Sequence, residues 1–240
     1  MIRKLLGAAA AALLLVSSFA HAEIPWTFSN DTRYLAMGDS LAAGQGAIPV
    51  TQGYAYLLYK GGTFDSLTNT IFADAAVPGA KSADVLDFQV PQAATFFQVP
   101  PGAMEFKQVV TISVGGNDLL QILGGADPVT VLTAFQANLT NILVTLRAGL
   151  PKALIIIGNQ YDIPDITAGI PGAAQIIVHF NAIIAGVAQA TGVRVADVFD
   201  AFQGRNGLLL VERHGADAHE VHPTNAGYRV MADAFAAAAR

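Results

Sequence analysis

Short apolar runs rich in β-branched residues alternate along the chain with segments whose apolar positions recur every three or four residues. The short runs predict strands and the periodic segments predict helices. The predicted strands are Tyr34–Asp39, Thr68–Ala75, Val109–Val114, Ala153–Ile157 and Val193–Phe199. This alternation is typical of a parallel sheet covered by helices on both faces. We therefore expect an α/β protein built on a five-stranded parallel sheet.

Helix signals are strongest in the middle of the chain. Asp127 is a good N-cap, Pro128 suits the first turn, and Gly149 closes the periodic segment that follows. The other predicted helices are Gly53–Tyr59, Ser82–Phe88 with Ser82 as a cap, Ala173–Ala190 and Asn225–Ala239. Two proline-containing stretches, Gln89–Glu105 and Asp162–Gly172, read as loops that could flank a pocket.

Small and polar residues follow the first three predicted strands. The first strand leads to Ser40, the second to Gly79 and the third to Asn117. In open α/β sheets, ligands bind outside the carboxyl ends of the strands. An ester carbonyl held at this edge would meet one hydroxyl and several hydrogen-bond donors.

A candidate base lies near the other end of the sequence. His222 precedes Pro223, which suits a first helical position, so the histidine is expected just outside a helix. A weak nucleophile paired with a base is the arrangement used in acyl transfer. We expect the fold to bring His222 to Ser40.

The first 22 residues have the pattern of a secretory signal peptide. Arg3 and Lys4 precede the apolar stretch Leu5–Phe19, and Ala20-His21-Ala22 fits a cleavage site. The alternative is an uncleaved membrane anchor, although the stretch is short for a spanning helix. We expect residues 1–22 to be removed and residues 23–240 to form a single secreted or periplasmic domain.

Composition excludes several classes of function. The chain has no cysteine, which removes disulfides, thiol catalysis and thiolate metal sites. A net charge of −5 without a basic cluster argues against a nucleic-acid partner. No transmembrane segment is expected in the mature chain, and the oligomeric state is left open.

Four short motifs resemble the blocks of the SGNH hydrolases, also called the GDSL esterase/lipase family. Gly38-Asp39-Ser40-Leu41 matches the first block, Gly79 stands where the second block keeps its glycine, and Gly115-Gly116-Asn117-Asp118 matches G-x-N-D. His222-Pro223 resembles the last block. The resemblance covers nearly all of the mature chain. It implies a flavodoxin-like three-layer α/β/α sandwich and hydrolysis of carboxylic esters, with a small-molecule or lipid ester as substrate and no cofactor.

The resemblance also implies a role for each matching residue. Ser40 would attack the carbonyl and His222 would act as general base. The N–H groups of Ser40 and Gly79 and the side-chain amide of Asn117 would form the oxyanion hole. Asp39 and Asp118 are interpreted as structural carboxylates that accept hydrogen bonds from loop N–H groups.

One position departs from the family pattern. The family places an aspartate three residues before the base, whereas this chain has His219 there. Glu220 is the first candidate to orient the imidazole, Asp217 the second, and a backbone carbonyl, giving a Ser–His dyad, the third.

Two other functions remain as alternatives. His214, His219 and His222 with neighbouring acids are a candidate cluster for a metal-dependent hydrolase, although the spacing does not match H-E-x-x-H and no metal is expected. The missing aspartate would also fit a non-catalytic secreted binding protein of the same fold. The apolar residues Phe96, Phe97, Val99 and Met104 hint at an acyl pocket in the first proline-containing stretch.

Overall fold

The five apolar runs form one parallel sheet in the order β2-β1-β3-β4-β5. The strands are β1 (Thr32–Gly38), β2 (Thr70–Asp74), β3 (Lys107–Ser113), β4 (Leu154–Gly158) and β5 (Arg194–Ala196). This computed structural model describes residues 32–65, 70–99, 105–163, 167, 169–205 and 221–240. The predicted five-stranded parallel sheet is confirmed.

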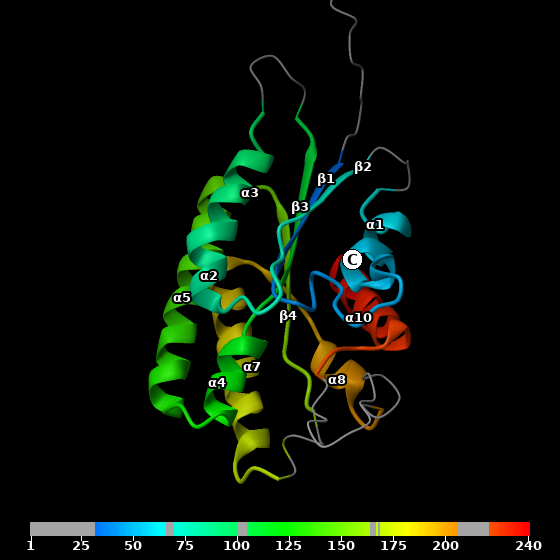
Figure 1. Cartoon of the computed structure of the whole chain (residues 1–240). Coiled ribbons are helices and arrows are strands. Elements are labelled where there is room, and N and C mark those ends of the chain that lie inside the picture. The colour runs from blue at the N-terminus through cyan, green and yellow to red at the C-terminus, as the bar shows by residue number, and fades with distance from the viewer. Residues whose placement is uncertain (1–31, 66–69, 100–104, 164–166, 168, 206–220) are drawn as a thin grey trace, which may run out of the picture.

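Helices cover both faces of the sheet, so the predicted three-layer arrangement is also confirmed (Figure 1). One layer holds α1 (Tyr54–Lys60), α8 (Val198–Phe202) and α10 (Asn225–Ala238). The other holds α2 (Ser82–Asp84), α3 (Val90–Phe96), α4 (Gly116–Leu123), α5 (Pro128–Gly149) and α7 (Ala173–Thr191). A 3₁₀ turn spans Val50–Gln52, and a π-helical segment, Val85–Gln89, joins α2 to α3.

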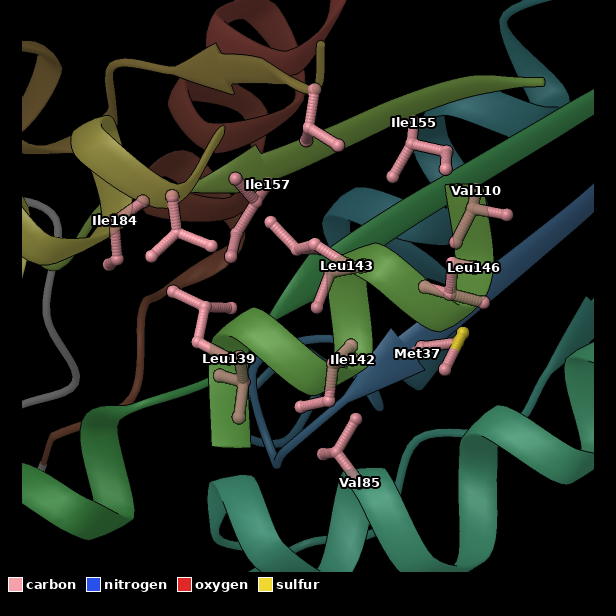
Figure 2. Packing of buried hydrophobic residues seen from close by; sticks show 14 of the residues in the cluster. Met37, Val85, Val110, Leu139, Ile142, Leu143, Leu146, Ile155, Ile157 and Ile184 are labelled. Atoms are coloured by element: carbon pink, nitrogen blue, oxygen red, sulfur yellow. The ribbon is translucent and has the colours of Figure 1, made fainter. Parts of the chain in front are cut away.

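Alternate residues of each strand enter opposite cores. In β1, Leu35 and Met37 pack toward α5 and α7, whereas Tyr34 and Ala36 pack toward α1 and α10. Figure 2 shows the first core, in which the apolar stripe of α5 lies against side chains of β1, β3 and β4. Since both faces are buried, the central strands read as continuous apolar runs rather than alternating ones.

Helices α5 and α7 are long and apolar enough, by length and composition alone, to cross a membrane. The buried helices of a water-soluble core have the same composition. Here both helices contribute buried side chains to the core on the sheet, among them Leu139, Leu143 and Ile184.

Several elements differ from the sequence prediction. The stretch 89–105 was predicted to be a loop, but α3 occupies Val90–Phe96 and continues the helical run of α2 and the π-helical segment, which ends two residues before Pro91. Helix α4 was not predicted, since its N-cap Gly115 and its first residue Gly116 are both glycines. The last strand is shorter than predicted and ends at Ala196, where Asp197 caps α8.

The strand order determines where a ligand can bind. The chain runs from β1 outward to β2 and then back across to β3, so the connections leaving β1 and β3 diverge to opposite sides of the sheet. In this strand order the crevice at the carboxyl ends of β1 and β3 is the usual ligand site. Ser40 follows β1 and Asn117 follows β3, which places both at this crevice.

Candidate active site

The turn after β1 holds Ser40 at the sheet edge by close backbone packing. Gly38 has a φ of +128°, and a Cβ built on it would lie 1.8 Å from the carbonyl oxygen of Ser113 in β3. Asp39 donates its N–H to that same oxygen over 2.9 Å. The amide of Gln89 brackets Gly38, accepting its N–H (2.6 Å) and donating to its carbonyl (2.8 Å). Only glycine can adopt the positive φ at position 38 and also leave room for the carbonyl oxygen of Ser113.

The fold brings the predicted nucleophile and base into contact. Nε2 of His222 lies 2.8 Å from Oγ of Ser40, although 182 positions separate the two residues in sequence. Both side chains are buried, with 8% of Ser40 and 9% of His222 exposed. A hydrogen bond of this length allows proton transfer between the two groups.

Several hydrogen bonds hold the segment that carries His222. Asn225, the first residue of α10, accepts the N–H of Ile48 (2.9 Å) and donates to its carbonyl (2.7 Å). The Tyr228 hydroxyl donates to the carbonyl of Gln45, and the Tyr161 hydroxyl donates to that of Val221. The bonds of Asn225 and Tyr228 attach the start of α10 to the loop that follows Ser40, and the bond of Tyr161 attaches Val221 to the segment after β4.

The predicted donors of an oxyanion hole lie around the same turn. Among the described residues, no hydrogen bond uses the backbone N–H of Ser40 or of Gly79. Nδ2 of Asn117 donates one hydrogen to the carbonyl of Ala80 over 2.9 Å, which holds the amide beside the Gly79 turn and leaves its second hydrogen available. Gly79 has a φ of +85° and open space at its Cβ position, so the backbone conformation, not crowding, favours glycine there.

Asp39 and Asp118 are structural carboxylates, as predicted. Oδ1 of Asp39 accepts the N–H of Leu41 (3.0 Å) and the hydroxyl of Ser113 (3.2 Å). Asp118 accepts both the N–H (2.9 Å) and the hydroxyl (2.7 Å) of Ser82. The predicted cap role of Ser82 is therefore wrong: Lys81 is the N-cap, and the Ser82 hydroxyl points inward to Asp118. Burial raises the pKa of Asp39 to about 7 and also raises that of Asp118.

The raised pKa of Asp39 predicts a pH-dependent stability. The pKa of its carboxyl is near the ordinary value of 3.8 in the unfolded chain but about 7 in the folded protein, so between these pH values the folded state holds one more proton. Stability should therefore fall as the pH rises through this window. We expect Asp39→Asn to flatten the fall by on the order of 2 kcal/mol, because the amide keeps an acceptor for Leu41 and Ser113 without a charge to bury. Urea unfolding at about pH 4 and about pH 7 measures the change. If the free energy of unfolding fell by the same amount between the two pH values in both proteins, the raised pKa of Asp39 would be contradicted.

A pocket opens beside Ser40 and Asn117. It has a volume of about 50 Å³. Its apolar wall is formed by Leu119, Leu120, Leu123, Ile163 and Ile177, and its polar groups come from Asp39, Asn117, Gln160, Tyr161 and Thr167. The predicted stretch 162–172 thus contributes to the pocket. Of the residues proposed from the other stretch, the three that the structure describes do not line it: Phe97 is buried in the core, Phe96 packs against that core and Val99 is exposed.

Sequence reasoning missed two residues at this edge. Gln89 lies in the stretch interpreted as a loop, and nothing in the sequence marked it as a partner of Gly38. Gln160 closely follows β4, so the rule that selected Ser40 and Asn117 also applies to it.

Several predicted residues lie outside the described part of the chain. These are Glu220 and Asp217, the candidates to orient His222, the candidate metal ligands His214 and His219, Met104, and the predicted signal peptide 1–22.

The chain is similar to known proteins in sequence and in fold. The model of the GDSL-like Lipase/Acylhydrolase family matches residues 36–230. An extracellular lipase from Streptomyces rimosus is 21% identical, with a TM-score of 0.63 over 86% of this chain and 99% of that one. A lipase from a goat rumen metagenome is 25% identical (TM-score 0.62; 86% and 97% covered). An acetylxylan esterase from Geobacillus stearothermophilus is 17% identical (TM-score 0.62; 86% and 93% covered). No curated protein matches the chain.

Proposed function

Because the chain belongs to the GDSL-like lipase/acylhydrolase family, and is therefore a hydrolase of ester substrates, we propose that it is a secreted serine esterase with Ser40 as nucleophile and His222 as base. The observation that carries the proposal is the 2.8 Å contact between Nε2 of His222 and Oγ of Ser40 at the mouth of a pocket. A buried serine hydroxyl bonded to an imidazole is the arrangement that activates a nucleophile.

Acylation begins with attack of the Ser40 oxygen on the ester carbonyl carbon. The hydroxyl proton moves to Nε2 of His222 as the new C–O bond forms. The tetrahedral intermediate then expels the alcohol, which takes the proton back from His222 and leaves an acyl group on Ser40. Water repeats the sequence, with His222 as base, and releases the carboxylic acid and the free serine.

Negative charge on the carbonyl oxygen is stabilised by donors that are already in place. The N–H groups of Ser40 and Gly79 make no hydrogen bond within the described residues, and Asn117 has one amide hydrogen left. Fixed donors of this kind avoid the cost of reorganising solvent during the reaction.

The pocket accepts the acyl side of the ester. The leaving alcohol must face His222, which protonates it, and His222 lies just before α10 in one helical layer. The pocket wall includes α4 and α7 of the opposite layer, so the remaining part of the ester is placed against them (Figure 1). One water molecule needs a cavity of about 10–15 Å³. The pocket volume of about 50 Å³ therefore suits an acyl group of few carbons.

Two parts of the proposal concern residues outside the described chain. Glu220 is the first candidate to hold the other ring nitrogen of His222, with Asp217 or a backbone carbonyl as alternatives. Residues 1–22 are proposed to direct export and to be cleaved after Ala22, which follows from their sequence pattern.

Labelling with an alkyl fluorophosphonate tests the nucleophile directly. The Ser40 oxygen displaces fluoride from phosphorus while His222 accepts the proton, so the folded protein is expected to gain one phosphonyl group on the peptide that contains Ser40. Intact-mass and peptide mass spectrometry locate the adduct. Urea-unfolded protein serves as the control and is expected to remain unlabelled. An adduct on a different serine, or an active enzyme without any adduct, would refute the proposal.

A further inference from the structure

The pocket beside Ser40 contains a buried amide whose oxygen accepts no hydrogen bond from the described residues. Only 5% of Gln160 is exposed. Its Nε2 donates to the carbonyl of Val114 over 2.9 Å, which fixes the orientation of the amide. Its backbone is held by Asn181, which donates to its carbonyl (2.8 Å) and accepts its N–H (2.7 Å). No described residue donates a hydrogen bond to Oε1.

A second acceptor faces the same small space. Oδ1 of Asp39 is bonded to Leu41 and Ser113, whereas Oδ2 accepts no hydrogen bond from another described residue. A Cβ built on Gly116 would lie 3.4 Å from Oε1 of Gln160 and 3.6 Å from Oδ2 of Asp39. The two oxygens therefore both lie within 4 Å of one position in the pocket lining.

Both oxygens can be reached from the pocket. Within the described residues, the Tyr54 hydroxyl is the one side-chain polar atom that is both sealed from solvent and without a partner. Gln160 and Asp39 both line the pocket, so their free oxygens open into it. Above about pH 7 the Asp39 carboxyl is ionised, and neither oxygen can then donate to the other. Two converging acceptors leave a place for one external donor.

We propose that Gln160 and Asp39 select esters whose acyl chain carries a hydroxyl group close to the carbonyl, that is, esters of short hydroxy acids. This inference rests on the proposed function and specifies its substrate class. A hydroxyl donor suits this site because the remaining wall is apolar and small, and burying a hydroxyl costs far less than burying an ammonium group. A plain acyl chain would cover the two acceptors without satisfying them, and that loss discriminates against it.

Matched ethyl esters measure the selectivity. Hydrolysis of ethyl butyrate, ethyl 2-hydroxybutyrate and ethyl 3-hydroxybutyrate is followed by pH-stat titration at about pH 8, where both oxygens are acceptors. For the wild-type protein we expect kcat/KM for at least one hydroxy ester to exceed that of the butyrate ester by about tenfold. The readout is this ratio, which a general loss of folding or activity leaves unchanged.

Two variants test the acceptors by different routes. Gly116→Ala places a methyl group at ordinary van der Waals distance from both oxygens and removes neither, and no positive φ opposes alanine there. Gln160→Met removes Oε1 while keeping a similar side-chain length. We expect both variants to bring the ratio close to one. Leu120→Ala, in the apolar wall of the same pocket, is the control and is expected to change both rates by the same factor.

The outcomes separate this inference from the proposed function. A wild-type ratio near one, with Ser40-dependent turnover of all esters, would overturn the hydroxy-acid assignment and leave the esterase proposal standing. A high ratio that survives in both Gly116→Ala and Gln160→Met would also overturn it. No turnover of any ester, together with no phosphonate adduct, would remove both proposals.

Discussion

Replacement of Ser40 by alanine is expected to lower kcat at least about a thousandfold while the protein remains folded. The hydroxyl contacts Nε2 of His222, so its removal takes away the proposed nucleophile without breaking a backbone hydrogen bond. A series of p-nitrophenyl esters of increasing acyl length measures the effect, because the common leaving group keeps the assay the same across the series.

Ser113→Ala is the matched control for that loss. It also removes one buried hydroxyl from the carboxyl edge of the sheet, but this hydroxyl bonds the structural carboxylate of Asp39. We expect it to lower the free energy of unfolding by about 1 kcal/mol and to spare most of the turnover. Undiminished rates in Ser40→Ala would place the nucleophile elsewhere in the molecule.

Gly38→Ala is expected to destabilise the fold by more than about 3 kcal/mol, or to prevent folding. The added Cβ would lie 1.8 Å from the carbonyl oxygen of Ser113 and 2.7 Å from its carbonyl carbon, in the middle of the sheet. Relief requires β1 and β3 to separate, which would break their ladder and the bond from Asp39 to Ser113. The φ of +128° adds strain for any residue with a side chain.

The control for this change is another glycine in a regular element. Gly186 lies within α7, and a Cβ built there would meet nothing within 4 Å. Gly186→Ala is expected to raise stability by about 0.5–1 kcal/mol, since alanine loses less backbone entropy in a helix. Urea unfolding compares both variants with the wild type. A Gly38→Ala protein as stable as the wild type would disprove the packing constraint at this turn.

Most of the secondary structure could be predicted from the sequence, because helix caps and apolar runs involve only residues that are close along the chain. Asp127 accepts the N–H of Thr130 and starts α5 at Pro128, and Thr224 caps α10 in the same way. The apolar runs of β1, β3 and β4 are continuous because both faces of these strands are covered, and this pattern is visible without a structure. Prediction failed at α3 because Pro91 normally ends a helix, whereas here the helical run continues past it after a π-helical segment.

The sequence predicted only those parts of the candidate site that follow directly from the position of the strand ends at one edge of the sheet. Ser40, Gly79 and Asn117 follow the first three strands, and a parallel sheet brings such ends together. The role of Gln89 could not be predicted from the sequence, because its contact with Gly38 depends on how the helical layer packs on β1. The sequence also could not predict that Oε1 of Gln160 and Oδ2 of Asp39 accept no hydrogen bond from the described residues, since this depends on every neighbour in space.

The sequence by itself determined the α/β class, the order of the strands along the chain and the residue types available for ester chemistry. Periodicity, caps and turns act over a few residues, so they can be read from neighbours along the chain. Only the tertiary structure decided that His222 meets Ser40 and that α4 and α7 contribute to the pocket beside Ser40, whereas none of residues 89–99 does. These contacts join segments far apart in sequence, and their geometry follows from the packing of whole layers, which no local pattern encodes.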